Sequence, residues 1–272
     1  MTQENYSYSD RNPPPNNRQL LILLGAAIAL IIGIIWALGL AINGIIGLIP
    51  PQVELKLGSF IVPVFEEQAK PSPAQDRLNQ LLDRLEQHLP QEQQERDYGV
   101  LYVPQDTVNA IAIPGDVVII YKGLLEQMES ENELMMVLGH ELGHFAHRDH
   151  LRRLGRSVLL RFAIAYFVGD AGALQGILAN SALKVGESRF SQSQEMAADE
   201  FGLTLLNATY NRVAGATDFF ARLAKERGQN WAILSTHPAP KRRVRKLNRL
   251  ISQRNYPIGE KVPLPSVLQS DL

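Results

Sequence analysis

The residues with the clearest chemistry are His140, Glu141 and His144, which lie in the run VLGHELGH. Histidines four positions apart in a helix share one face, so both imidazoles can bind a single metal ion. A catalytic zinc ion takes three protein ligands and keeps a fourth position for water, whose pKa falls to roughly 7 on the metal. Glu141 is then placed to accept a proton from that water as general base. The motif predicts a zinc hydrolase site that needs one more ligand.

Two residues compete for the role of third ligand. His150 lies six positions after His144, a spacing used by zinc endopeptidases that turn the chain at an intervening glycine. That position holds His147 here, and in a continuing helix His150 would point away from the other two histidines. Glu195, in the run FSQSQEMAAD, can instead complete a His₂Glu site from a separate helix. We therefore predict Glu195 as the third ligand.

One helical turn after Glu195 comes Asp199. A carboxylate in that place can accept a hydrogen bond from a ligand imidazole and fix its tautomer. Ala197 and Ala198 are small enough to let this helix approach the first one closely. The competing interpretation is a solvated acidic patch on a surface helix, and the metal motif favours the functional role.

The N-terminal part of the chain has the pattern of a membrane anchor. Residues 1–19 are polar and rich in Asn, Ser and Pro, as in a disordered tail. Residues 20–49 carry no charge and are long enough to cross a hydrocarbon core of about 30 Å. A cleaved signal peptide would have a shorter apolar core, and a buried soluble helix is rarely apolar on every face. We predict one retained transmembrane helix.

The charges that flank this helix predict its orientation. Arg11 and Arg18 precede it, and only Lys56 follows closely. Because positive residues favour the cytoplasmic side, the catalytic domain is expected outside the cytoplasm, on the periplasmic side of a single-pass membrane protein.

Residues 50–74 are predicted to be a linker. Residues 75–254 have the pattern of a mainly α domain with a small antiparallel β-sheet, and residues 255–272 are predicted to be a tail. Leucines at helical spacing predict an amphipathic helix, with Leu78, Leu81, Leu82, Leu85 and Leu89 on its buried face.

Three short β-rich runs, at 98–103, 107–113 and 116–121, predict the sheet. An edge strand beside a zinc site could pair with an extended peptide substrate, although the sheet could also serve only as support. Ser130 and Glu133 predict the start of the metal-binding helix as cap and capping-box partner.

Residues 157–183 are apolar but interrupted by charges and glycines. Their uncharged stretches are too short to span a membrane. They are expected to form a buried helical hairpin, or one that lies at the membrane surface or covers the site.

The composition excludes several classes of protein. The formal net charge is −1, with no basic face that would indicate nucleic-acid binding. The chain has no cysteine, so disulfides, thiolate metal ligands and thiol nucleophiles are all absent.

The motifs resemble those of the HtpX-like zinc metallopeptidases, a family that also includes type I CAAX prenyl proteases and membrane quality-control peptidases. The resemblance rests on residues 139–144 and on Gln194-Glu195-x-x-Ala198-Asp199. It extends to Asn109-Ala110, Pro114-Gly115, Gly123-Leu124-Leu125, Ser235-Thr236-His237-Pro238 and Arg243.

The resemblance implies a zincin-like domain with one Zn²⁺ per chain, bound by His140, His144 and Glu195. It implies Glu141 as the catalytic base and Asp199 as a residue that supports a ligand.

The C-terminal motif adds two further site residues. The resemblance places His237 and Arg243 near the zinc site, where both could donate to the developing oxyanion or to substrate. From the residues alone, His237 could cap a helix and Arg243 could belong to a solvated basic run at 241–243. Gln192 departs from the family pattern, since many relatives have Arg there.

One predicted span argues against the large membrane chamber of prenyl proteases, so the likeness is closer to single-anchor or periplasmic quality-control members. We expect a membrane-anchored zinc endopeptidase that cleaves unfolded or damaged proteins and binds no nucleic acid. The alternative is a non-proteolytic membrane adaptor or chaperone with a structural zinc site. Glu141 argues against that alternative, because a structural site needs no base.

Overall fold

The computed structural model of the chain describes residues 16–154, 169, 189–225 and 231–270. The chain divides into two compact units, Met1–Gly47 and Leu48–Leu272. Helix α1 (Asn17–Leu48) forms most of the described part of the first unit. Among the described residues, no helix is both long and apolar enough to cross a membrane. The anchor at 20–49 therefore stays a prediction.

Two other predicted segments cannot be compared with the structure. Most of the predicted N-terminal tail lies outside the described residues, and so does the predicted hairpin at 157–183 apart from Gly169.

The second unit contains a three-stranded sheet with the order β1-β3-β2. Its strands are β1 (Gly99–Val103), β2 (Ala110–Ile113) and β3 (Val117–Tyr121). β2 and β3 form an antiparallel hairpin, but β1 runs parallel to β3. The prediction of a fully antiparallel sheet is therefore wrong. The connection after β1 carries the chain past the place of β3, so that the last strand fills the centre.

The outer edge of β1 is covered by α3 (Pro73–Glu86). Asn79 accepts a hydrogen bond from the Val100 backbone N–H at 2.7 Å, and Gln75 accepts one from Tyr102 at 3.1 Å. Since unpaired backbone groups at an edge invite another strand, these side chains close that edge. The other edge of the sheet, β2, faces the metal-binding helix.

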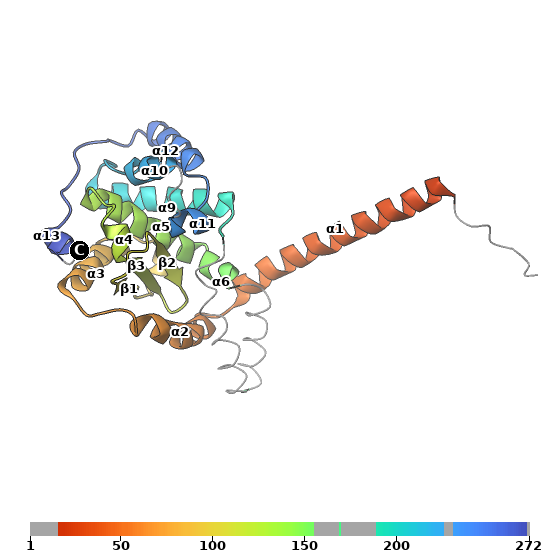
Figure 1. The fold of residues 1–272 in the computed structure, drawn as a ribbon, viewed down its shortest axis with the longest axis horizontal. Coiled ribbons are helices and arrows are strands. Elements are labelled where there is room, and N and C mark those ends of the chain that lie inside the picture. The colour runs from red at the N-terminus through yellow and green to blue at the C-terminus, as the bar shows by residue number, and fades with distance from the viewer. Residues whose placement is uncertain (1–15, 155–168, 170–188, 226–230, 271–272) are drawn as a thin grey trace, which may run out of the picture. The chain divides into compact units, whose positions relative to one another are not determined.

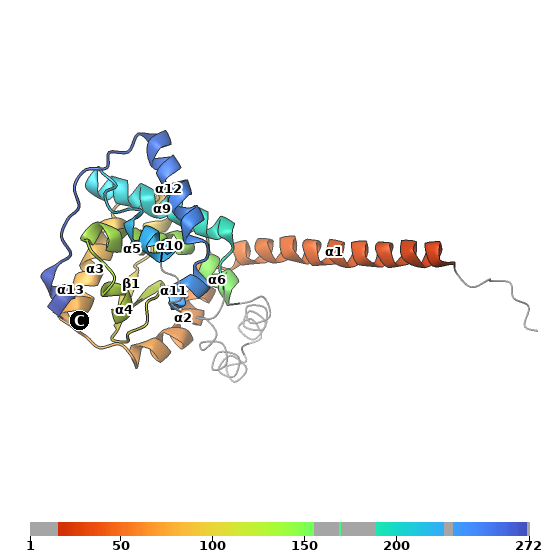
Figure 2. The ribbon, with the colours of Figure 1, turned by 45° about the horizontal axis from the view of Figure 1, so that its top comes forward.

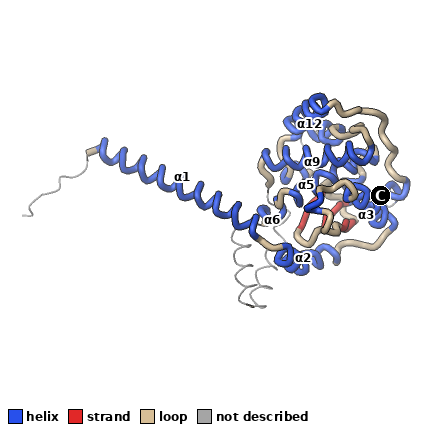
Figure 3. Tube along the Cα trace, turned by 180° about the vertical axis from the view of Figure 1, so that it is seen from behind, coloured by secondary structure: helices blue, strands red, loops and turns tan. Residues whose placement is uncertain are grey.

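The elements of this unit form successive layers (Figure 1). Helix α2 (Pro51–Glu66) lies on one side of the sheet, and α5 (Glu131–Ala146) lies on the other. Behind α5 come α9 (Gln192–Tyr210) and α12 (Pro240–Arg254). Figure 3 shows the strands enclosed by helices.

Shorter helices complete the described part of this unit. They are η1 (Gln91–Gln93), α4 (Lys122–Leu125), α6 (Asp149–Arg153), α10 (Asp218–Lys225), α11 (Ala232–Thr236) and α13 (Ser266–Ser270).

The segments predicted as linker and tail are more ordered than expected. α2 occupies most of 50–74, begins with Pro51 in its first turn, and buries Val53, Leu57 and Ile61. At the other end, α13 lies beside α3, as Figure 1 and Figure 2 both show. Leu264 and Leu268 are buried there.

The predicted leucine helix is confirmed as α3, which ends before Leu89, and all five leucines are buried. Ser130 is the cap of α5, since its Oγ accepts a hydrogen bond from Glu133 N at 3.3 Å. The other half of the predicted capping box, a hydrogen bond from the Ser130 backbone N–H to the Glu133 side chain, is wrong. Glu133 instead accepts from the backbone of Glu129 and forms an ion pair with Arg222.

Candidate metal centre

Helices α5 and α9 carry most of the site and pack at unusually short range. A Cβ added to Gly143 would lie 2.7 Å from Cα of Ala198, and one added to Gly139 would lie 3.0 Å from Cα of Gly202. Small residues therefore set the distance between the two helices. The expected close approach is present at Ala198, which is fully buried, whereas Ala197 is partly exposed.

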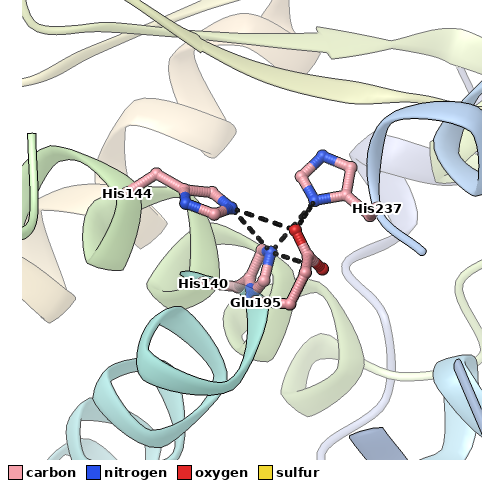
Figure 4. A group of neighbouring side chains, drawn as sticks. All are labelled: His140, His144, Glu195 and His237. Atoms are coloured by element: carbon pink, nitrogen blue, oxygen red, sulfur yellow. Dashed lines mark hydrogen bonds and ion pairs between the residues drawn. The ribbon is translucent and has the colours of Figure 1, made fainter. Parts of the chain in front are cut away.

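Four side chains point their donor atoms at one another (Figure 4). They are His140 and His144 from α5, Glu195 from α9 and His237 at the end of α11. All four are buried, and one ligand atom from each lies within 4.8 Å of the others. The structure thus brings together the three predicted ligands and His237, and it places Arg243, the other residue expected near the site, against Glu195.

The arrangement of these atoms fits a metal ion. The Nε2 atoms of His140 and His144 are 3.1 Å apart, and Glu195 Oε1 is 3.6 Å from the second of them. Two facing ring nitrogens can share at most one proton, whereas a metal takes a lone pair from each. His237 Nε2 is buried without a hydrogen-bond partner among the described residues. Two imidazoles and a carboxylate are a ligand set typical of zinc.

Asp199 and Arg243 form a buried network beneath two of these ligands. Asp199 Oδ1 accepts from His140 Nδ1 at 2.9 Å, which directs Nε2 of that histidine toward the group. Arg243 donates to both oxygens of Asp199, at 2.8 and 2.5 Å, and pairs with Glu195 Oε2 at 2.7 Å. Arg243 therefore forms ion pairs with two carboxylates. It is buried rather than part of a solvated basic face.

The other ligand histidine has a partner that the sequence did not reveal. His144 Nδ1 lies 3.1 Å from Oδ2 of Asp149, at the start of α6. Asp149 Oδ1 accepts from Gln194 at 2.7 Å and from Arg152 at 2.9 Å. Its position depends on a turn after α5, so helical spacing alone gave no signal for it.

Glu141 faces the sheet edge. Its Oε2 accepts a hydrogen bond from the backbone N–H of Ala112 in β2, at 3.0 Å. Its Oε1 lies 3.8 Å from Nε2 of His237. One oxygen is thus held by the sheet, and the other is directed into the site.

The charges of the site keep its carboxylates ionised. Burial alone would raise the pKa of Glu195, but Arg243 and His237 outweigh it and hold that pKa well below its usual value. Burial opposes ionisation of Glu141 as well, yet the neighbouring histidines, His237 foremost, lower its pKa. A group that must accept a proton is therefore deprotonated at neutral pH.

The two ligand histidines differ in their electrostatics. Burial and Arg243 lower the pKa of His140. Burial also opposes protonation of His144, but hydrogen bonds to Asp149 and Glu195 raise its pKa to about 9.

His150 lies outside the metal group. Helix α5 ends at Ala146, and Arg148 adopts the left-handed backbone region at φ 56° before α6 begins. The chain therefore turns, rather than continuing as the helix assumed from the sequence. His150 Nε2 is 2.5 Å from Oε1 of Glu54, a buried residue of α2.

Comparison with known proteins agrees with this geometry. Residues 73–251 match peptidase family M48. Metalloprotease LoiP of Escherichia coli is 33% identical over 153 residues, which are 54% of this chain and 60% of that protein. Mitochondrial metalloendopeptidase OMA1 of Arabidopsis thaliana is 30% identical, over 58% of this chain and 32% of that protein.

The beta-barrel assembly-enhancing protease of Escherichia coli is 27% identical, over 52% of this chain and 32% of that protein. The matched part of the chain thus spans less than two thirds of the length of each of these three relatives.

The fold and the donor set define a zinc metalloprotease site with a glutamate as third candidate ligand. The chain belongs to peptidase family M48. The predicted resemblance is confirmed at this level, and with it the expectation of one zinc ion per chain as cofactor.

Proposed function

We propose that this chain is a zinc-dependent endopeptidase whose ligands are His140, His144 and Glu195. The observation that carries the proposal is the convergence of their donor atoms in a buried group, with Glu141 beside it. A bound Zn²⁺ would act there as a Lewis acid toward the scissile carbonyl and would lower the pKa of a water molecule to roughly 7.

The base is Glu141, acting through Oε1. Because Ala112 donates to Oε2, the carboxylate cannot rotate freely, and Oε1 stays directed into the site. It accepts a proton from the attacking water and passes it to the amine that leaves when the peptide C–N bond breaks.

His237 and Arg243 have different roles. His237 supplies an imidazole N–H to the oxygen on which negative charge develops, since its Nε2 is buried near Glu141. Arg243 holds Glu195 and Asp199 in place through its three short contacts, rather than contacting substrate.

We infer that the edge strand β2, whose residues are buried beside the site, would bind the backbone of an extended peptide that enters the site. The outward N–H groups of Ala110 and Ala112 are bound by Asn109 at 3.1 Å and by Glu141 at 3.0 Å. The carbonyl oxygens of the same residues point the same way, because N–H and C=O of one strand residue lie on one edge. These carbonyls can accept hydrogen bonds from substrate N–H groups.

The cellular setting is part of the proposal. The uncharged run at 20–49 supports a membrane anchor, and the flanking charges support a catalytic domain on the periplasmic side. Substrates would be unfolded or damaged membrane and envelope proteins. The name of one relative, a beta-barrel assembly-enhancing protease, is in keeping with a role in envelope protein quality control.

One observation favours a second candidate. His237 lies within the same group as the three proposed ligands, and a fourth protein ligand would close the site, as in structural zinc centres. The chain would then be a non-proteolytic membrane adaptor or chaperone.

The variant Glu141→Gln separates the two functions. It removes the proton acceptor while keeping the size of the side chain. Casein cleavage should fall by about 10²-fold or more, with zinc content unchanged. Glu126→Gln, at a partly exposed position on the surface, is the matched control and should behave as wild type. Equal cleavage by Glu141→Gln and wild type would rule out the endopeptidase mechanism.

A further inference from the structure

Asp149 is a buried carboxylate that contributes neither to the group of candidate ligands nor to the base. We propose that it is a positioning residue for the metal. It fixes His144 in the tautomer that turns Nε2 toward the site, and through Gln194 it ties this histidine to the helix that carries Glu195. The inference rests on the proposed function, because it takes His144 and Glu195 as zinc ligands.

The tautomer follows from the chemistry of the partner. An ionised carboxylate only accepts hydrogen bonds, so Asp149 Oδ2 at 3.1 Å requires a proton on Nδ1 of His144. The lone pair for a metal is then on Nε2, the atom that lies 3.1 Å from Nε2 of His140. Burial of both residues excludes water as a substitute acceptor.

A turn between α5 and α6 brings Asp149 next to His144. Arg148, at φ 56°, reverses the chain between α5 and α6, so that the first residue of α6 folds back toward the last turn of α5. This conformation is unfavourable for a residue other than glycine. It is held by contacts of the Arg148 guanidinium with the Ile49 carbonyl at 2.7 Å and with Glu54 Oε2 at 3.2 Å.

Gln194 connects Asp149 to the third ligand. Its Oε1 accepts from the Ser191 backbone N–H at 2.9 Å, which completes the capping box of α9. Its Nε2 donates to Asp149 Oδ1 at 2.7 Å. The residue after it in α9 is Glu195. One amide side chain therefore fixes the start of this helix and joins it to the carboxylate behind His144.

Asp149 thus binds Nδ1 of His144 in the same way as Asp199 binds Nδ1 of His140. Asp199 accepts from Nδ1 of His140 at 2.9 Å and is held by Arg243. Each ligand histidine has its own carboxylate, and each carboxylate is bound by a donor from a different helix, α9 for Asp149 and α12 for Asp199.

The test is Asp149→Asn in the full chain in detergent, with Asp218→Asn as the control at an exposed carboxylate paired with Lys261. With Gln194 and Arg152 both donating on one side, the introduced amide keeps its oxygen there and turns its NH₂ group toward His144. That favours a proton on Nε2, which then has no lone pair for zinc.

Zinc affinity, measured by competition with a fluorescent chelator, should fall by about 10- to 100-fold, and the control should stay within about twofold of wild type. In the metal-free protein labelled with ¹⁵N-histidine, at an alkaline pH at which the imidazole is neutral, the ring proton of His144 should move from Nδ1 to Nε2, with the resonance assigned by His144→Gln. A merely structural role would lower stability without moving that proton.

An unchanged affinity, or a proton that stays on Nδ1, would overturn the inference. If Asp149→Asn does not fold, Gln194→Met decides, since it should weaken zinc binding by a smaller factor, and wild-type affinity there would also overturn it. Failure of the proposed function looks different, because wild type itself would then bind no zinc or cleave no casein.

Discussion

Arg243 offers the sharpest test of how the site is held together. It is buried, and its guanidinium makes three short contacts with the carboxylates of Asp199 and Glu195. The variant Arg243→Met keeps an apolar stem of similar length and removes the charge. Two buried carboxylates then lose their compensating cation, although both are kept ionised by it in the wild type.

Breaking a buried ion pair from one side costs about 3–5 kcal/mol, because the remaining charge is left uncompensated. Against a typical stability of about 5–15 kcal/mol, that loss is large and measurable. We expect it in urea unfolding of the metal-free chain in detergent, followed by far-UV circular dichroism.

The control is Arg242→Met at the adjacent position. Arg242 is exposed and donates to Gln192 at 2.6 Å. Its loss should change the free energy of unfolding by less than about 0.5 kcal/mol. A loss below about 1 kcal/mol in Arg243→Met would refute the claim that this arginine holds the two carboxylates.

Three further predictions concern other parts of the molecule. His237→Phe should keep one zinc per chain and lower the casein cleavage rate by about 10²–10³-fold, whereas loss of zinc would make this residue a fourth ligand. Gly143→Ala should destabilise the chain by about 1–3 kcal/mol in urea, despite alanine's better helix propensity, because its Cβ would lie 2.7 Å from Cα of Ala198; an unchanged midpoint would contradict the close packing. Burial opposes ionisation of Glu54, but His150 and Arg96 lower its pKa from 4.5 to about 2. Glu54→Gln should therefore lower the free energy of unfolding by about 3 kcal/mol above pH 5. Because the wild-type advantage is lost as the pH falls through about 2, the two unfolding curves should converge in acid, and a constant difference from pH 6 to pH 2 would contradict this account.

The candidate ligands could be predicted because their signal is local. His140 and His144 are brought together by the geometry of one helix turn. Glu195 and Asp199 repeat this logic on a second helix, and Ala197 and Ala198 on that helix indicated that the two could meet.

Features that depend on the path of the chain could not be predicted in the same way. The parallel pairing of β1 with β3 is set by where the connection between β1 and β2 travels, and the alternation of side chains does not record that path. Asp149 reaches His144 only because Arg148 adopts a left-handed backbone conformation. Glycine is the residue that usually marks such a conformation in a sequence, so an arginine gave no sign of the turn.

Tertiary contacts also determine the environment of charged residues, and the family resemblance, rather than the local sequence, placed Arg243 near the site. Arg243 stands in a basic run and yet is buried between two carboxylates, while its neighbour Arg242 is exposed. The segment expected to be a linker forms α2, which places Glu54 next to His150 and Arg96.

The central claim is that zinc is bound by His140, His144 and Glu195. Zinc content of the purified chain, measured after dialysis for wild type, Glu195→Ala and His150→Ala, tests it most directly. We predict one zinc per chain in wild type and in His150→Ala, and loss of zinc in Glu195→Ala. Zinc retained by Glu195→Ala and lost from His150→Ala would contradict the account.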